Sequence, residues 1–236
     1  MGRLSHSRPT RWAVGDGGLT SPSGAELTPE QALAAMPSLG IHEVLLDGEV
    51  FEVERVGSRY CSVDDVRQRA EVDNDDFDDT TKYPDDVVLD AIQAAEEQLE
   101  QACKRSFCKR ARVVTVPATI TLCELPEVDV SSLEPVNPLA EVYLLSDRQA
   151  ANWTGEPVDA VMTYGTACSE RMRRAAMTLA AMRLRPRAGA ENARGASVNG
   201  VYISYELATG ADGSWTGVPE VDATIESCRS RRVVIG

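Results

Sequence analysis

Few residues in this 236-residue chain have the types and spacing that catalysis or metal binding requires. The histidines are His6 and His42, and the six cysteines form no CxxC pair. Zinc sites and histidine-assisted nucleophiles need such residues in close, regular spacing. Gly-rich phosphate loops, GxSxG and HExxH are absent from the sequence. The sequence therefore predicts no enzyme, no metal and no cofactor, with His42 as a surface or packing residue and mostly buried, reduced cysteines.

The densest acidic stretch is the one place in the sequence that suggests a bound cation. Five aspartates lie within Asp73–Asp79, interrupted by Asn74 and Phe77. A calcium-binding loop needs Gly at its sixth position and Glu at its twelfth, but Asp78 and Pro84 occupy those positions. The preferred interpretation is a solvated acidic loop that precedes a helix.

The net charge of −13 is unevenly distributed along the chain. Residues 1–100 carry 8 basic and 22 acidic side chains, whereas residues 101–236 carry 16 and 15. Duplex binding depends on neutralising phosphates with Lys and Arg, so this charge argues against a protein that reads nucleic-acid sequence. No run approaches the roughly 20 apolar residues of a membrane span. No apolar secretory segment follows Met1, so we expect synthesis in a cytoplasm.

Arginines gather in the second half of the chain, and two interpretations of them are open. They form either a solvated face that pairs with the chain's own aspartates or a surface that contacts acidic surfaces of neighbouring copies. The second interpretation predicts a subunit interface made by Arg171, Arg173, Arg174, Asp75 and Asp76. The chain ends in a basic segment with an apolar tip, which suits insertion into a groove on another protein. That segment contains Arg229, Arg231, Arg232, Val233, Val234 and Ile235.

The first 58 residues are expected to form an arm, a short helix and a β-hairpin. Residues 1–27 have no hydrophobic period and are rich in Gly, Ser, Thr and Pro, which is typical of a flexible arm. The sequence Thr28-Pro29-Glu30-Gln31 offers an N-cap, a proline at the first helical position and a capping-box glutamine, and predicts a helix to about Met36. An Asp47-Gly48 turn between the runs 43–46 and 50–56 predicts the hairpin.

The remaining elements follow from the hydrophobic period. A helix begins at Ser62, and a longer helix at about 84–106 has an apolar stripe from Val88 to Cys103 at steps of three and four. Its opposite face, with Glu96, Glu97 and Glu100, is expected to be exposed to solvent. Period-two runs predict strands at 113–116, 120–123, 141–145 and 158–164. Helices are predicted at 166–185 and after Pro219, separated by a loop at 187–199 and a strand at 201–205.

Three motifs resemble those of tailed-bacteriophage head–tail connector (adaptor, or head completion) proteins. The first is Cys61-Ser62-Val63-Asp64-Asp65-Val66 followed, after the acidic segment, by a helix that ends in Lys104-Arg105-Ser106-Phe107. The second is Val161-Met162-Thr163-Tyr164-Gly165 leading into Arg173-Arg174-Ala175-Ala176. The third is Gly217-Val218-Pro219-Glu220-Val221-Asp222-Ala223 before the last helix and tail. Together they cover about residues 60–236 in the expected order.

The resemblance implies an α+β, mainly α, fold. The helical connector core would comprise 59–109 and 166–230, with a β-rich insert at 110–165. The N-terminal arm with its short helix and hairpin would occupy 1–58, and the extended C-terminal tail 231–236. Compact members of the family lack the first 58 residues and the insert.

The same resemblance implies a structural protein of the virion neck. About twelve copies would form a ring under the portal protein at the portal vertex, with the next neck protein (stopper or tail terminator) on the far side. The C-terminal segment would dock on the portal, and the N-terminal arm could wrap the neck, contact the capsid or contact neighbouring subunits. DNA would pass through the central channel without sequence-specific binding.

A protein that lines a DNA channel should not bind the DNA that passes through it, and every contact with a phosphate adds affinity for DNA. We therefore expect acidic residues, either Glu96, Glu97 and Glu100 or the 73–79 run, to face the channel or its rim, and the arginines to serve subunit contacts. Three alternatives remain: another neck component such as a stopper or tail-completion protein, a soluble DNA-packaging factor that binds DNA through Arg171–Arg187, and a small hydrolase with an unrecognised site.

Overall fold

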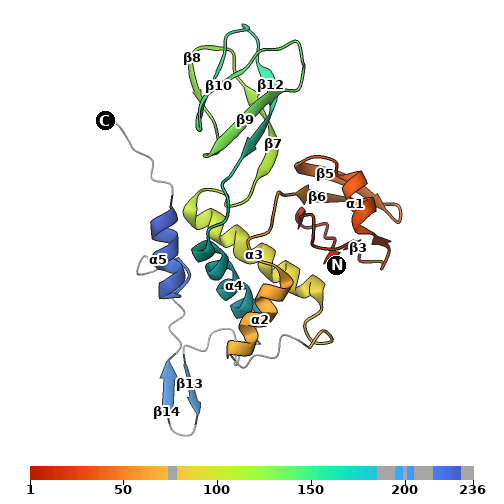
Figure 1. Cartoon of the computed structure of the whole chain (residues 1–236), viewed down its shortest axis with the longest axis vertical. Helices are drawn as coiled ribbons and strands as arrows, with labels where there is room; N and C mark the ends of the chain where they lie inside the picture. The colour runs from red at the N-terminus through yellow and green to blue at the C-terminus, as the bar shows by residue number, and fades with distance from the viewer. Residues whose placement is uncertain (74–78, 185–194, 199–200, 205–214, 230–236) are drawn as a thin grey trace.

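Four helices build the centre of the molecule (Figure 1). They are α2 (Val63–Asp73), α3 (Asp85–Cys103), α4 (Glu170–Leu184) and α5 (Pro219–Cys228). The computed structural model describes residues 1–73, 79–184, 195–198, 201–204 and 215–229. The stripe on α3 that the spacing predicts is buried, from Val88 through Ile92 and Leu99 to Cys103. Alanines on α3 and α4 line the contact between these helices, which brings their backbones close together. We call this helical bundle the helical core.

Residues 1–56 fold into a second core, which contains the predicted helix and hairpin. One sheet has the order β1-β3-β4, and another has the order β2-β6-β5, in which β2 runs parallel to β6. The strands are β1 (Gly2–Arg3), β2 (Thr10–Trp12), β3 (Leu19–Thr20), β4 (Glu26–Leu27), β5 (Gly40–Leu46) and β6 (Glu49–Arg55), and the helix is α1 (Pro29–Ala35). We call this part the N-terminal module.

The expectation of a flexible arm at 1–27 is wrong. Leu4, Trp12 and Leu19 are fully buried against Phe51 and Met36 of the same module. These apolar residues are too widely spaced in the sequence to show a period, and only the tertiary fold brings them together.

Both local signals in the N-terminal module are confirmed. Thr28 Oγ1 accepts a hydrogen bond from the backbone N–H of Gln31, and Gln31 Oε1 accepts one from the backbone N–H of Thr28, at 3.3 and 2.9 Å. Asp47 and Gly48 have φ values of 54° and 80°, the left-handed pair that a two-residue hairpin turn of type I′ requires.

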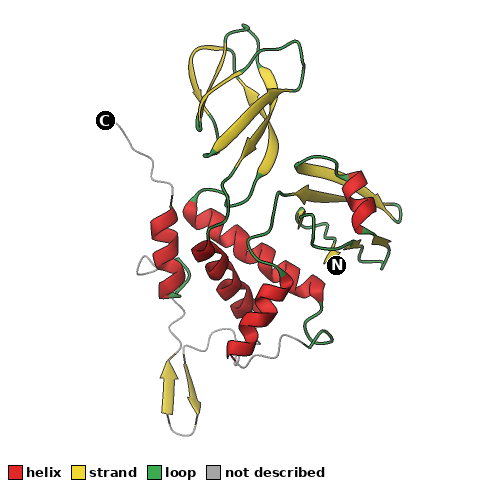
Figure 2. Ribbon diagram, in the orientation of Figure 1, coloured by secondary structure: helices red, strands yellow, loops and turns green. Residues whose placement is uncertain are grey.

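Six strands between residues 110 and 164 form a third core, here called the β core (Figure 2). One sheet has the order β7-β12-β9, and the other has the order β10-β11-β8. The strands are β7 (Arg110–Val116), β8 (Thr119–Glu124), β9 (Val130–Pro135), β10 (Tyr143–Ser146), β11 (Gln149–Asn152) and β12 (Val158–Tyr164). β9 and β11 were not predicted, because VSSLEP and QAAN have little β-branched or aromatic content.

The balance of secondary structure corrects the expectation of a mainly α fold. Helix and strand are almost equally represented among the described residues, which is an α+β composition. A further antiparallel pair, β13 (Gly195–Val198) and β14 (Val201–Ser204), lies at the opposite end of the molecule from the β core (Figure 1). The predicted strand at 201–205 is therefore present, whereas β13 falls in the predicted loop at 187–199. No described helix is long and apolar enough to cross a bilayer.

The β core is attached to the helical core by two chain segments that lie close together. Gly165 has a φ of 98°, and a Cβ at this position would lie 2.0 Å from the carbonyl oxygen of Cys108. The backbone N–H of the next residue, Thr166, donates to the carbonyl of Ser106 at 3.1 Å. Only glycine allows the two segments to approach this closely.

We predict that Gly165→Ala destabilises the chain by about 2–4 kcal/mol, because left-handed backbone strain adds to a clash with a neighbouring carbonyl. Gly48→Ala is the matched control, since Gly48 also has a positive φ but no atom within 4 Å of its would-be Cβ. It should cost only about 1–2 kcal/mol. Urea unfolding of both variants measures the difference, and equal losses would contradict the close-approach argument.

Candidate functional site: a buried ion-pair cluster and the surfaces around it

A cluster of buried charges lies where the three cores meet. Arg11 of β2 and Arg59, just before α2, have side chains that are only 5% exposed. Glu96 of α3, 1% exposed, lies between them. Arg110 of β7 and Glu100 of α3 extend the cluster toward the β core. The cluster therefore contains charged residues from all three cores.

The carboxylates of the cluster accept hydrogen bonds at both of their oxygens, and the Arg110–Glu54 pair is bidentate. Arg59 Nε donates to both carboxylate oxygens of Glu96, at 3.0 and 3.1 Å. Arg110 donates to both oxygens of Glu54 on β6, at 2.6 and 2.8 Å. The Tyr60 hydroxyl donates to Glu100 Oε1 at 2.8 Å and accepts from the backbone N–H of Phe107 at 2.7 Å. Such paired geometry is what allows charges to be buried without a large loss of stability.

The electrostatics of the cluster favour permanently charged arginines. Burial by itself would lower the pKa of Arg11, but the nearby carboxylates of Glu100 and Glu96 raise it by more. The pKa of Arg59 is raised for the same reason, chiefly by Glu96 and Asp16. Burial raises the pKa of Tyr60, so its hydroxyl remains a donor at neutral pH. These groups are fixed in one charge state, which suits a structural role.

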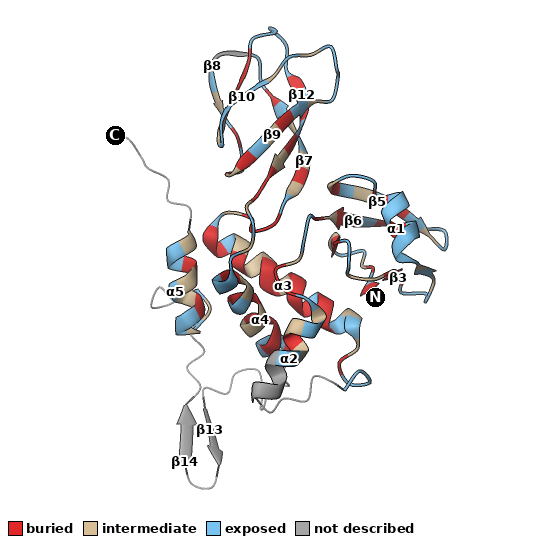
Figure 3. Cartoon of the chain, viewed as in Figure 1, coloured by how far each residue is buried: buried red, intermediate tan, exposed pale blue. Residues whose placement is uncertain are grey.

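The expectation that Glu96, Glu97 and Glu100 form a wet face is wrong for two of the three. Much of α3 is buried (Figure 3). The N-terminal module brings arginines to this side of α3, so Glu96 and Glu100 are enclosed. Side chains enclosed in this way have little surface to present to a channel. Glu97 keeps a side chain that is 41% exposed and pairs with Arg8 at 2.8 Å.

The arginines predicted at a subunit interface have different surroundings. Arg173 binds both carboxylate oxygens of Asp65 on α2, so the self-pairing interpretation holds for this residue. Arg174 is 70% exposed, and its only ion pair with a described residue is with Glu170, at 3.1 Å. Arg171 is exposed and has no hydrogen bond or ion pair with any described residue. Their predicted partners Asp75 and Asp76 lie outside the described residues.

The predicted portal-binding segment begins at a well-anchored helix. α5 packs into the helical core through Val221 and Ile225. At the end of α5, the guanidinium of Arg229 lies over the Trp215 ring, 4.5 Å from its centroid. The backbone N–H of Arg229 donates the last hydrogen bond of the helix, to the carbonyl of Ile225. The rest of the segment, Arg231, Arg232, Val233, Val234 and Ile235, lies outside the described residues.

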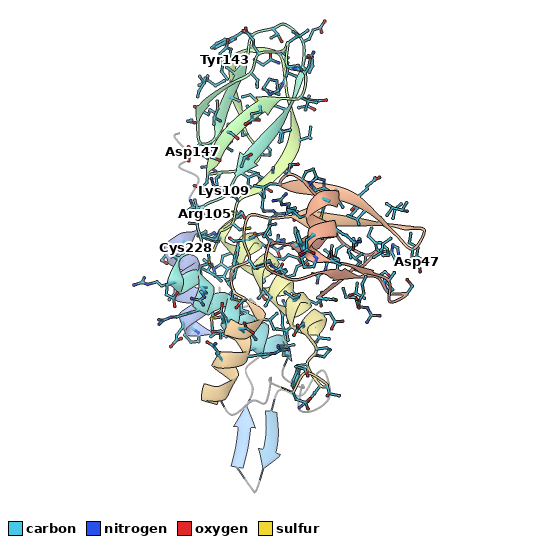
Figure 4. All side chains as sticks on the ribbon, turned by 45° about the vertical axis from the view of Figure 1, so that its right-hand side comes forward. Asp47, Arg105, Lys109, Tyr143, Asp147 and Cys228 are labelled. Carbon is cyan, nitrogen blue, oxygen red and sulfur yellow. The ribbon has the colours of Figure 1, made fainter. Side chains whose placement is uncertain are left out.

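The β core has an apolar surface that was not predicted from the sequence. The rings of Tyr143 and Trp153 pack against each other at an angle of 33°, with centroids 5.1 Å apart, and the two residues are 42% and 60% exposed. Figure 4 shows Tyr143 at the end of the β core that is far from Arg105 and Lys109. The other large exposed apolar residues of this core are Val113, Leu122, Val136, Leu139, Leu145 and Val161. The short strands of this core carry apolar residues at both odd and even positions, and this pattern in the sequence could have indicated the exposed apolar surface.

The described residues contain no group of three or more His, Cys, Asp or Glu side chains that could hold a metal ion. All six cysteines are free thiols. Burial raises the pKa of Cys103, Cys108 and Cys168 to about 12, so these thiols stay protonated at neutral pH. His42, expected to be a surface or packing residue, is half-buried, and its ring Nε2 lies 2.8 Å from the carbonyl oxygen of Ser38.

Comparison with known proteins found no matching family model and no matching curated protein. Two solved chains have a similar structure. One belongs to the neck of an empty gene transfer agent particle computed with C6 symmetry, with 19% identity, a TM-score of 0.46, and coverage of 74% of this chain and 91% of that chain. The other belongs to the virion of a native gene transfer agent particle, with 20% identity, a TM-score of 0.40, and coverage of 65% and 81%.

We predict that Glu96→Ala destabilises the chain by about 3–5 kcal/mol, because it leaves Arg11 and Arg59 buried with too few carboxylates. Glu97→Ala, one position along the same helix, is the control. Its side chain is partly exposed, so its loss should change stability by less than about 0.5–1 kcal/mol. Thermal and urea unfolding measure both. A loss below that of the control would show that the cluster does not hold the cores together.

Proposed function

We propose that this chain is a structural subunit of a virion neck, a head–tail connector (adaptor) that forms a ring beneath the portal protein. The main observation that supports this proposal is that the segments resembling connector proteins pack into one core. Nearly all residues of the helical core come from 60–66, 83–108, 172–184 and 221–225. The N-terminal module and the β core lie largely outside the three motifs and have their own buried residues.

The surfaces of the subunit agree with an assembly role. The cluster described above is structural, whereas Arg171, Arg174 and the aromatic pair of the β core face solvent. The C-terminal segment leaves a helix that is fixed to the helical core, so a portal contact made by the tail would be transmitted to the whole subunit. The proposal rests on the sequence motifs and these surfaces, not on the gene transfer agent chains.

The remaining parts of the proposal follow from the connector resemblance. About twelve copies would surround a DNA channel, with the next neck protein on the far side and the capsid as a partner of the N-terminal module. Of the acids expected at the channel or rim, we retain Glu97 and the 73–79 run, because Glu96 and Glu100 are enclosed. Synthesis would take place in the host cytoplasm before assembly at the portal vertex.

One observation favours a second candidate within the neck. A stopper or tail-completion protein usually has a more β-rich body, and the described residues of this chain have about as much strand as helix. The position in the neck separates the two candidates: an adaptor contacts the portal directly, whereas a stopper contacts the adaptor.

We predict that the chain binds the portal protein encoded with it and that deleting residues 230–236 removes this binding. The deletion begins after Arg229, so it leaves α5 and its contact with Trp215 in place. Co-purification with portal measures binding, and cryo-electron microscopy of the complex shows the ring and its position.

The controls separate folding from docking. The shortened chain should unfold at the same temperature as the full chain, because the deletion leaves every described residue of the helical core in place. Portal binding that survives the deletion would exclude the tail as the anchor. If the full-length chain does not bind the portal protein but binds duplex DNA in a salt-dependent manner, the DNA-packaging alternative is supported instead.

A further inference from the structure

A groove lies between α4 and α5 on the surface of the helical core. It has a volume of about 420 Å³. Arg171, Arg174 and Thr178 form the α4 side, and Glu220, Ala223 and Thr224 form the α5 side. The buried residues Ala175 and Val221 lie at its base. The small side chains leave room for a segment of another molecule.

The positive charge beside this groove is only weakly neutralised by the described residues of the chain. The third arginine of this stretch, Arg173, is occupied by Asp65 and is not part of the groove lining. Arg174 has only an exposed pair with Glu170, one helical turn away, and such pairs contribute about 0.3–0.5 kcal/mol. Arg171 has no partner among the described residues. The one acid of the groove, Glu220, is on the opposite helix.

The complementary surface of the same chain is at the start of α3. Asp79 and Asp85 are exposed, as is Asp90, and Asp86 is half-exposed. Val87, 43% exposed, lies among them as an apolar contact point. Arg67 and the N-terminal ammonium of Met1 neutralise Asp85, and Arg8 neutralises Asp90, only in part, because these two carboxylates remain 49% and 72% exposed. This acidic start of α3 faces solvent.

These two surfaces lie on different sides of the helical core. α5 and the first turn of α3 appear on opposite sides of the bundle in both Figure 1 and Figure 4. A single chain therefore cannot satisfy one surface with the other. Two unlike, complementary surfaces on opposite sides make head-to-tail contacts, and such contacts close into a ring when the rotation permits. A two-fold contact would instead place like charges together, which is unfavourable.

We infer that the α4–α5 groove is the subunit contact of the ring and that it receives the acidic start of α3 of a second copy. The inference rests on the proposed function and names the contact that the ring uses. Arg171 and Arg174 bind the neighbour's carboxylates, and Val87 of the neighbour packs on the small side chains of the groove. This contact uses residues at the start of α3, whereas the sequence-based prediction paired the arginines with Asp75 and Asp76. Arg173 takes no part in it, because it pairs with Asp65 of the same chain.

Two variants test the contact from its two sides. Arg171→Ser with Arg174→Ser removes the charge of the groove, and Asp86→Asn with Asp90→Asn removes the charge of the partner surface. Each variant should fail to form complete rings on portal at a concentration where the unchanged chain is fully assembled. Arg183→Ser is the control on the same helix, since Arg183 is exposed, lies outside the groove and contacts Gln98 at 3.0 Å. It should assemble normally.

Mixing the two variants tests the head-to-tail geometry. One intact groove then meets one intact acidic surface, so the mixture should yield two-chain complexes and no rings. Mass photometry counts the chains, and circular dichroism verifies that each variant is folded. Rings from either variant, or from the mixture, would overturn the inference while leaving the connector role intact. Failure of the unchanged chain to form rings on portal would overturn the connector role, and the inference with it.

Discussion

The carboxylate of Glu96 is the contact on which the arrangement of the molecule depends. It accepts hydrogen bonds from Arg59 and from the backbone of Tyr60, and it lies 3.4 Å from Arg11 of the N-terminal module. One helix turn further, Glu100 binds Arg11 and Arg110. Each arginine would be strongly destabilising if buried alone. Together with the Arg11–Glu54 pair inside the N-terminal module, these contacts between the cores favour one relative position of the three.

This constraint decides which surfaces are left for partners. The N-terminal module covers one side of α3 and removes its carboxylates from solvent, so they serve cohesion of the subunit. The groove between α4 and α5, the acidic start of α3 and the apolar end of the β core remain open. A subunit with a rigid junction and unlike surfaces on different sides is suited to repeated contacts in a symmetric assembly.

Local signals in the sequence were sufficient for most of the helices and for the first hairpin. The capping box at Thr28, the Asp47-Gly48 turn and the stripe of α3 are each set by neighbours a few residues apart, and each is present. The failures share one cause. β11, the packing of Trp12 and the enclosure of Glu96 depend on residues up to 85 positions away, which no short pattern contains.

The sequence by itself determined the charge asymmetry, the lack of catalytic and metal motifs and the order of the helices, because these depend on composition and short-range spacing. The tertiary structure alone decided what each charge does. Glu96 and Glu97 are adjacent in the sequence and looked equivalent on a wet helix face. The fold buries the first beside Arg59 and leaves the second partly in water, because the N-terminal module packs against one side of α3 only.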